Sequence, residues 1–301
     1  MRIRQTVALI LGAAALAITA GGTRAGTPSL QQTTSTAMHG RSGTAVVVEV
    51  ATGRVLAAEH LDVAARRLVY PGSAVKPFTL MALLQRGVVA ADTQFVCPGR
   101  LRIGGRRMDC AHGRLPGPLD AASALAYSCN NYFAHFGARL RDADLTQAFA
   151  GLVRSSGWAE REASGSITTA SGESGLEMKA LGEAGIQVTP LGMLAAYREL
   201  ALRKLRGDSD PAFQVVYRGL EQAVEFGTGQ PARAGGLAVA GKTGTARASE
   251  GAWTHGWFAG IAPAERPEIA VVVFLERGRG LDAAAIAGDI LRAYATGPGA
   301  R

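Results

Sequence analysis

Lysine and aromatic residues are scarce in this chain of 301 residues, which has 32 basic residues in all. Only four of them are lysines, at positions 76, 179, 204 and 242, and aromatic residues make up 6% of the chain. So few aromatic side chains argue against a large aromatic-lined cavity. Because a buried lysine can lose its proton and an arginine cannot, each lysine is a candidate for acid–base chemistry. Lys179 and Lys204 lie outside the motifs described below, and we expect both at the surface.

Cysteine is also rare, and its three residues allow at most one intramolecular disulfide. Cys97 and Cys110 flank a loop, residues 98–109, which is rich in glycine and arginine and has little to pack. A bridge between them would hold this loop together and leave Cys129 free. We favour this bridge over the alternative of three reduced, partly buried thiols.

Long apolar runs are missing after residue 20. Before it, Arg2 and Arg4 precede an apolar run over 7–20, which is shorter than the roughly 20 residues of a membrane span. Residues 1–25 therefore read as an export signal, either a cleaved signal peptide or an uncleaved anchor, which would place the protein in the periplasm or another extracytoplasmic space. Residues 26–42 are polar and are predicted to form a flexible stalk. The remainder, 43–296, is predicted to be one domain.

Charged residues account for only 19% of the chain and hydrophobic residues for 48%, which indicates a globular rather than a disordered protein. Acidic residues are outnumbered, so the net charge is +8 and the isoelectric point is about 9.9. No nucleic-acid-binding module accompanies this charge, so a nucleic-acid partner is not expected. The excess charge favours peripheral association with an anionic membrane or cell-wall surface; the alternative is an arginine-rich surface without a partner.

Strand patterns stand at both ends of the domain and helix patterns in its middle. A β-hairpin is predicted over 44–59 and three strands over 238–247, 254–262 and 269–277, followed by a closing helix at 282–294. The predicted helices between them are 78–84, 119–127, 131–140, 145–153, 190–205 and 211–226, with a loop over 163–175. The expected fold class is α+β, with an antiparallel sheet built from both chain ends, flanked by helices and joined to a helical subdomain.

The first motif is Ser73-Ala74-Val75-Lys76, which follows Pro71-Gly72. Pro-Gly favours a turn, after which Ser73 opens a predicted helix. Residues three apart on a helix share a face, so the Lys76 amine can reach the Ser73 hydroxyl. A neutral lysine could take the serine proton, and the helix N-terminus offers N–H donors to an oxyanion. The alternative is that Ser73 only caps a helix and Lys76 is a surface charge.

The second motif, Ser128-Cys129-Asn130, lies at the junction of two predicted helices. Ser128 could relay a proton between lysines and a leaving group, and Asn130 could hydrogen-bond the amide of a substrate. Taken alone, the motif is better explained as a turn between two helices with good helix-capping residues.

The third motif is Lys242-Thr243-Gly244-Thr245 on a predicted strand. Lys242 and the hydroxyls of Thr243 and Thr245 suit a substrate carboxylate, and Gly244 would let a ligand lie against the strand. The alternative is a glycine bulge on an edge strand. Residues 236–243 also fit the phosphate-loop pattern, but that pattern needs a flexible loop followed by a helix. Here the interior is apolar and strand-like and a further strand follows, so nucleotide binding is rejected.

Together, the order Ser-x-x-Lys, Ser-x-Asn, Lys-Thr-Gly resembles the signature shared by penicillin-binding proteins and serine β-lactamases. The wider context is similar to the transpeptidase domain of penicillin-binding proteins and covers roughly residues 43 to 295. The segments that carry this resemblance are 70–73, Gly113, 127–133, 185–191, 224–229 and 255–263. The resemblance implies that the fold is the one shared by β-lactamases and transpeptidases.

The resemblance also implies a mechanism. Ser73 attacks a D-Ala-D-Ala peptide bond with Lys76 as base, and the backbone N–H groups of Ser73 and Thr245 hold the oxyanion. Ser128 and Lys242 help to protonate the departing amine. The amine of a neighbouring peptidoglycan stem peptide then takes the acyl group, whereas a β-lactam such as penicillin leaves Ser73 blocked. No metal or organic cofactor is implied.

Two other activities share the acylation step. A hydrolase, either a β-lactamase or a D,D-carboxypeptidase, would admit water to the acyl-enzyme, and a sensor would acylate without turnover. Glu173, Glu177 and Glu183 lie where one β-lactamase class carries its deacylating glutamate, but none has a matching context, so each is predicted to be a solvated loop charge. His112 and His255 are predicted to be structural.

Overall fold

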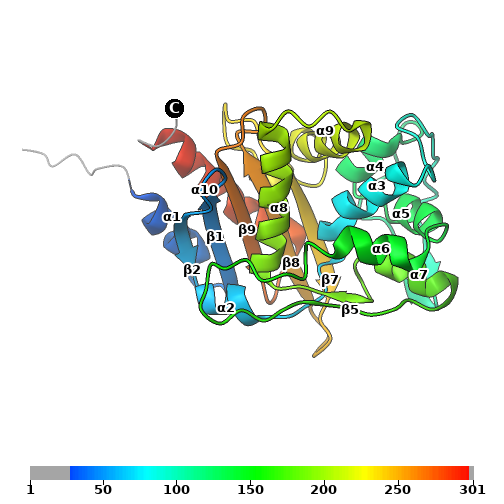
Figure 1. Ribbon diagram of the computed structural model, residues 1–301, viewed down its shortest axis with the longest axis horizontal. Coiled ribbons are helices and arrows are strands. Elements are labelled where there is room, and N and C mark those ends of the chain that lie inside the picture. Colours follow the sequence, from blue (N-terminus) through cyan, green and yellow to red (C-terminus); the bar gives the residue numbers. More distant parts are fainter. Residues whose placement is uncertain (1–27, 298–301) are drawn as a thin grey trace, which may run out of the picture.

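Strands from both ends of the chain meet in one antiparallel sheet (Figure 1). The computed structural model of the protein describes residues 28–297. The sheet has the order β2-β1-β9-β8-β7, with β1 at Gly43–Glu49, β2 at Val55–Glu59, β7 at Ala240–Arg247, β8 at Thr254–Ala262 and β9 at Ile269–Leu275. The register places Val46 opposite Val272 and Lys242 opposite Ala259. This confirms the predicted assembly of the sheet from both chain ends.

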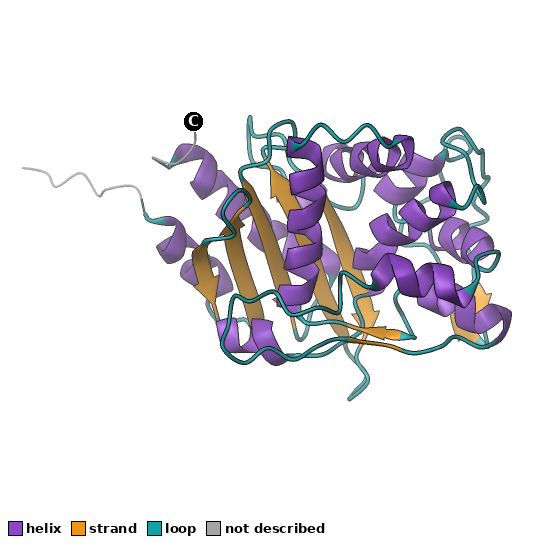
Figure 2. Ribbon diagram, viewed as in Figure 1, coloured by secondary structure: helices purple, strands orange, loops and turns teal. Residues whose placement is uncertain are grey.

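The central strands are covered on both faces. Alternate residues of β1 and β9 point to opposite sides, so Val46 and Val272 belong to one apolar cluster and Val47 and Val271 to the other. Helix α8 (Pro190–Leu205) packs on the first face, and α10 (Gly280–Thr296) packs on the second. Figure 2 shows α8 crossing one side of the strands. Burial on both faces explains why β9 is a continuous apolar run rather than an alternating one.

Residues 30–38 correct the expectation of a flexible stalk over 26–42. They form helix α1 (Leu30–Met38), which packs against α10 and β2. Ser29 caps the helix in a reciprocal pair with Gln32. The Gln31 side chain donates to the carbonyl of Ala58 and accepts from its amide, so it pairs with edge strand β2 as a further strand would. The polar composition that suggested a stalk supplies these bonds. The predicted export signal, 1–25, lies outside the described residues.

The remaining helices form the helical part of the molecule, to the right of the sheet in Figure 1. They are α3 (Lys76–Gln85), α4 (Ala121–Ala126), α5 (Asn130–Gly137), α6 (Asp142–Phe149), α7 (Gly172–Ala180) and α9 (Pro211–Glu225). Helix α2 (Leu61–Arg66) lies by the sheet and, like α7, was not predicted. The predicted loop over 163–175 contains the short strand β5 (Ser166–Ile167), which pairs with β6 (Ile186–Gln187), and the start of α7. Within the described range, no helix combines the length and apolarity that a bilayer crossing requires.

Lys179 is not at the surface as expected but fully buried in the helical part. Its amine donates to Asp142 Oδ1 at 2.5 Å, to Thr146 Oγ1 at 2.9 Å and to the carbonyl of Thr168 at 3.0 Å. These bonds tie α7 to α6 and to the segment after β5, so the buried charge is compensated and structural. Lys204 is half-buried, and its amine lies over the ring of Tyr217.

Candidate active site

Ser73 and Lys76 lie on one short turn of helix. Gly72–Val75 form a 3-10 turn, η1, which runs directly into α3. Side chains three residues apart nearly eclipse each other in a 3-10 turn, so Ser73 and Lys76 share a face more closely than on an α-helix. Ser73 is half-buried and Lys76 is fully buried. The turn begins at Gly72, whose φ of +52° is in the left-handed region that favours glycine.

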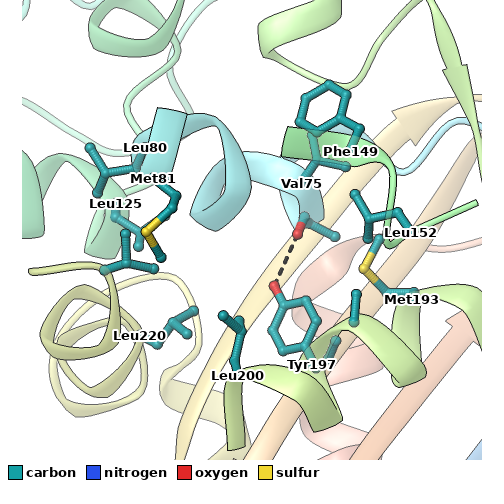
Figure 3. Packing of buried hydrophobic residues seen from close by; sticks show 14 of the residues in the cluster. Val75, Leu80, Met81, Leu125, Phe149, Leu152, Met193, Tyr197, Leu200 and Leu220 are labelled. Atoms are coloured by element: carbon teal, nitrogen blue, oxygen red, sulfur yellow. Dashed lines mark hydrogen bonds between the residues drawn. The ribbon is translucent and has the colours of Figure 1, made fainter. Parts of the chain in front are cut away.

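This turn is fixed by bonds from three surrounding segments. The Gly72 amide donates to the carbonyl of Gly182 at 2.9 Å, and the Trp257 indole of β8 donates to the carbonyl of Tyr70 at 3.2 Å. The Tyr197 hydroxyl of α8 donates to the carbonyl of Ala74 at 2.9 Å, and Figure 3 shows its ring pointing from α8 toward the segment of Val75. Because these partners are themselves buried, the position of Ser73 is set by the core.

Gly244 was expected to make room for a ligand, but in the structure it makes room for η1. A Cβ atom at this position would lie 2.6 Å from the carbonyl oxygen of Pro71 and 2.9 Å from the amide nitrogen of Ala74. The space beside the strand is therefore filled by η1 and not kept for a ligand. The missing side chain lets β7 approach η1 closely enough to bring the Lys-Thr-Gly strand beside Ser73.

Hydrogen bonds from the Lys76 amine link the first motif to the second. It donates to Asn130 Oδ1 at 2.6 Å, to the carbonyl of Ser128 at 2.8 Å and to Ser128 Oγ at 3.3 Å. Among the described residues, its hydrogen bonds go to these two and not to Ser73. Burial lowers the pKa of the Lys76 amine from 10.5 to about 8, although the nearby thiols and Glu183 oppose the change. An amine with this pKa is partly neutral near physiological pH and can accept a proton.

Ser128 occupies a strained position at the end of α4. Its φ is +56°, which is uncommon for a residue with a side chain. The amides of Ser128 and Cys129 donate to the carbonyls of Leu125 and Ala124, so Ser128 stands where glycine usually closes a helix of this kind. The left-handed conformation turns the chain sharply between α4 and α5, which leaves the carbonyl and hydroxyl of Ser128 facing Lys76.

Asn130 is already engaged within the protein. Its Nδ2 donates to the carbonyls of Met108 at 3.0 Å and Asp109 at 3.2 Å, while Oδ1 accepts from Lys76. The residue therefore joins the lysine to the arginine-rich loop over 98–109. In this arrangement it positions Lys76 and does not present a free amide to a substrate.

Lys242 is fully buried on β7, and it meets a residue that sequence reasoning did not include in the site. Its amine donates to the carbonyl of Thr243 at 3.0 Å and to Thr228 Oγ1 at 3.5 Å, and Thr243 Oγ1 donates to Thr228 Oγ1 at 2.7 Å. Burial, and then the charge of Lys76, hold the pKa of Lys242 well below its usual value. Thr228 stands in the 224–229 segment that carried part of the resemblance, and its flanking glycines were the available signal. Thr245 is exposed on β7, and its Oγ1 accepts from the amide of Gly280 at 2.9 Å.

The candidate glutamates differ in burial. Glu173 is exposed, as expected, and Glu177 is half-buried. The Glu183 side chain is only 10% exposed, so the expectation of a solvated loop charge is wrong for this residue. It lies 3.4 Å from the guanidinium of Arg106, and burial raises the pKa of its carboxyl. Glu183 precedes β6 and lies near enough to Lys76 for the charge of each to shift the pKa of the other.

The three cysteines are free in the structure, so the favoured bridge between Cys97 and Cys110 is not formed. The Sγ atoms of Cys97 and Cys110 are 3.6 Å apart. Cys129 was expected to be separate from this pair, but its Sγ lies 3.8 Å from that of Cys110. His255 is buried on β8 with Nδ1 bonded to the carbonyl of Glu276, a packing role as expected. His112, also predicted to be structural, has a ring nitrogen within 4.8 Å of the three cysteine sulfurs.

The chain is similar to known proteins in both sequence and structure. The family model described as the penicillin binding protein transpeptidase domain matches residues 43–293. A curated relative, the peptidoglycan D,D-transpeptidase MrdA of Acinetobacter baumannii, is 24% identical over 83% of this chain. The chain spans 50% of the length of that relative.

Solved structures share the fold at low identity. The D,D-transpeptidase domain of a peptidoglycan glycosyltransferase from Eggerthella lenta is 24% identical with a TM-score of 0.73, covering 88% of this chain and 80% of that one. Pseudomonas aeruginosa PBP2 is 23% identical with a TM-score of 0.76, covering 89% and 77%. The fold is thus the predicted one. Since the family model spans the sheet, the helical part and all three motifs, the chain belongs to the penicillin-binding protein transpeptidase domain family.

Proposed function

We propose that the protein is a serine-type peptidoglycan D,D-transpeptidase that forms an acyl-enzyme at Ser73 and binds penicillin there. The observation that supports this most is the convergence of three distant segments. Ser73 and Lys76 from η1 and α3, Ser128 from the α4–α5 turn, and Lys242 from β7 are brought together around one buried amine.

The first step is acylation of Ser73. Its oxygen attacks the carbonyl carbon of the D-Ala-D-Ala bond while neutral Lys76 takes the hydroxyl proton. The negative charge that develops on the carbonyl oxygen is held by the backbone N–H groups of Ser73 and Thr245. The packing of η1 against β7 at Gly244, with no side chain between them, is what brings these two segments side by side.

The second part is departure of D-Ala and transfer of the acyl group. The proton held by Lys76 passes through Ser128 Oγ, which already accepts a bond from the amine, to the leaving nitrogen. Lys242, with its lowered pKa, assists this transfer, and Thr243 and Thr245 bind the terminal carboxylate of the donor peptide. The amine of a second stem peptide then attacks the ester carbonyl and forms the cross-link. Lys76, neutral again, takes the amine proton and returns it to the Ser73 oxygen as the ester bond breaks.

The substrates assigned by this proposal are peptidoglycan stem peptides and, as inhibitors, β-lactams. The reaction takes place outside the cytoplasm, with residues 1–25 serving as a cleaved signal peptide or as an uncleaved anchor. The basic surface of the chain, net charge +8, supports peripheral contact with the anionic cell wall or membrane.

The test is mass spectrometry of the purified protein after incubation with benzylpenicillin. We expect one stable penicillin adduct, located on Ser73, in the wild type. Ser73→Ala should form none, whereas Ser174→Ala, which removes an exposed serine far from the motifs in sequence, should react as the wild type does.

Two results would contradict the proposal. Consumption of penicillin without a lasting adduct would identify a β-lactamase, and neither adduct nor consumption would show that the motifs mark an inactive fold. A second assay, with a pentapeptide donor and an amine acceptor, separates the remaining activities. Release of D-Ala with transfer to the amine supports a transpeptidase, release with water alone indicates a carboxypeptidase, and an adduct without D-Ala release indicates a sensor.

A further inference from the structure

Four potential metal ligands meet at the edge of the site. The side-chain donor atoms of Cys97, Cys110, His112 and Cys129 all lie within 4.8 Å of one another. They come from three places: the start of the loop that precedes strand β3 (Arg102–Ile103), the segment after strand β4 (Arg106–Arg107), and the N-cap of α5. Cys129 is buried and the other three residues are half-buried. A chain with three cysteines and five histidines has thus gathered all its thiols and one imidazole in one place.

The spacing of the sulfur atoms suits a shared ion. Two thiolates bound tetrahedrally to zinc at about 2.3 Å are separated by about 3.8 Å. The Cys97 and Cys110 sulfurs are 3.6 Å apart, and the Cys110 and Cys129 sulfurs are 3.8 Å apart. Sulfurs joined in a disulfide lie only about 2.05 Å apart. Cys110 is thus near both other thiols at once. One metal ion can bind all three sulfurs, whereas one disulfide can join only two of them.

The surrounding hydrogen bonds prepare each sulfur as an acceptor. Cys97 Sγ receives the amide of Gly99 at 3.3 Å, Cys110 Sγ receives Asn131 Nδ2 at 3.2 Å, and Cys129 Sγ receives the amide of Tyr132 at 3.4 Å. Donors of this kind stabilise thiolates and orient them toward a metal.

His112 supplies a second, independent indication. Its Nδ1 lies 2.8 Å from the carbonyl of Gly113, to which it donates, so the proton is held on Nδ1. Nε2 then carries a free lone pair. This atom is buried and forms no hydrogen bond with any of the described residues. An unpartnered buried nitrogen that faces three thiols, with its other nitrogen held by a backbone carbonyl, is the usual arrangement of a histidine ligand.

We propose that Cys97, Cys110, His112 and Cys129 bind one Zn²⁺ ion. Three thiolates and one imidazole form a donor set of the structural zinc class, in which the protein supplies all four ligands. Such a closed site leaves no position for a substrate or an activated water. The ion therefore takes no part in the acyl transfer at Ser73, whose mechanism needs no metal. On binding, the thiols give up their protons to solvent.

The ion would hold the second motif from both sides. Cys129 stands between Ser128 and Asn130, so its bond to zinc fixes the turn that places both residues against Lys76. Cys97 and Cys110 bound the loop whose carbonyls at Met108 and Asp109 accept from Asn130. This loop has only a two-stranded ribbon of two residues a strand, β3 with β4, to order it. A metal can supply the order that this short ribbon lacks.

The test is metal analysis of the intact chain, which does not depend on acylation of Ser73. We expect native mass spectrometry to find one zinc per chain after gel filtration. Replacement by Co²⁺ should give the thiolate-to-cobalt charge-transfer band and the intense visible bands of tetrahedral cobalt. This spectrum is recorded on the wild type, so it does not require any variant to fold.

Variants then assign the ligands. His112→Ala should weaken zinc affinity in a chelator competition by about 100-fold or more, because losing a ligand costs at least as much as losing its supporting partner. Cys110→Ser should abolish the charge-transfer band or shift it strongly. His39→Ala, which removes an exposed histidine, is the matched control and should bind as the wild type does. All three variants are compared with the wild type by circular dichroism to show that they are folded.

Three results would overturn the proposal. The first is a protein that retains no zinc and whose three thiols react with a thiol reagent equally fast with and without added Zn²⁺. The second is a Cys97–Cys110 disulfide in the isolated protein. The third is a His112→Ala variant that is folded and binds zinc as tightly as His39→Ala.

Discussion

The candidate site has two walls, which are held in place by different means. One wall is β7, which carries Lys242 and Thr243 and is paired with β8 along its whole length from Ala240 to Arg247. The other is the α4–α5 turn with the arginine-rich loop beside it. That wall has a two-stranded ribbon of two residues a strand, one strained serine and a cluster of cysteines.

This difference shows where side-chain chemistry decides the geometry. On β7, repeated backbone pairing sets the position of each residue, and most single side chains can change without moving the strand. In the turn and its loop, the position depends on a few individual groups, namely Asn130 with its two carbonyl acceptors, Ser128 and the thiols. The four predictions below test this contrast, starting with the residue at which the walls meet.

The largest effect is expected for Lys76→Arg. The arginine keeps the positive charge between the walls but cannot give up its proton at any accessible pH, so the base for Ser73 is lost. We expect the rate of acylation by a fluorescent penicillin to fall by roughly 10²–10⁴-fold. Lys204→Arg, on the distant α8, is the control and should change nothing. A rate within tenfold of the wild type would show that another group is the base.

The pH dependence of acylation should follow the neutral form of Lys76. Burial lowers the pKa of this amine to about 8, while the thiols of Cys97, Cys110 and Cys129 and the carboxyl of Glu183 raise it. Below pH 8 the amine is increasingly protonated, so the rate should fall by about tenfold per pH unit, and above pH 8 it should level off. Stopped-flow acylation between pH 6 and pH 10 gives the profile. A flat profile would contradict the assignment of Lys76 as base.

Gly244→Ala should damage the wall that backbone pairing builds. The new Cβ would meet the backbone of Pro71 and Ala74 at 2.6 and 2.9 Å, so β7 and η1 must separate. We expect a loss of about 1–3 kcal/mol in the free energy of unfolding, measured by urea denaturation, together with slower acylation. Gly117→Ala, where a Cβ would meet nothing within 4 Å, is the matched control. Equal stability of the two variants would mean that the approach of β7 to η1 can relax freely.

The smallest effect concerns strain at Ser128. Both Ser128→Ala and Ser128→Gly remove the hydroxyl that accepts from Lys76, but only glycine adopts a φ of +56° without strain. Ser128→Gly should therefore be more stable than Ser128→Ala by about 1 kcal/mol in the same denaturation experiment. Acylation should be impaired in both. If the two variants unfold at the same urea concentration, the strain at this turn is negligible.

Local patterns identified most of the elements and motifs. The hairpin over 44–59, the three late strands and helices such as 190–205 and 211–226 were predicted because their periodicity and capping residues are local signals. The sequence patterns do not predict the short helices α2 and α7, and they predict a stalk where α1 lies. Their apolar faces are brief, and much of what stabilises them comes from segments distant in sequence, as with Gln31 and β2.

Several errors share one cause. Lys179 and Glu183 were expected in solvent because charged residues usually lie there, yet both are buried against partners 37 and 77 residues away in sequence. The flanking glycines mark Thr228 as part of the 224–229 segment, but nothing local shows that its hydroxyl meets Lys242 and Thr243. Burial and pairing of polar groups depend on the approach of distant segments, which no local pattern encodes.

The sequence by itself determined the α+β class, the sheet shared by both chain ends and the three motifs, because periodicity and short spacings are properties of neighbouring residues. Only the tertiary structure decided that Lys76 bonds to Ser128 and Asn130 rather than to Ser73, that Gly244 makes room for η1, and that three cysteines and His112 form one cluster. Those outcomes depend on distances between segments up to about 170 residues apart, and such distances are set by how the helices and strands pack on one another.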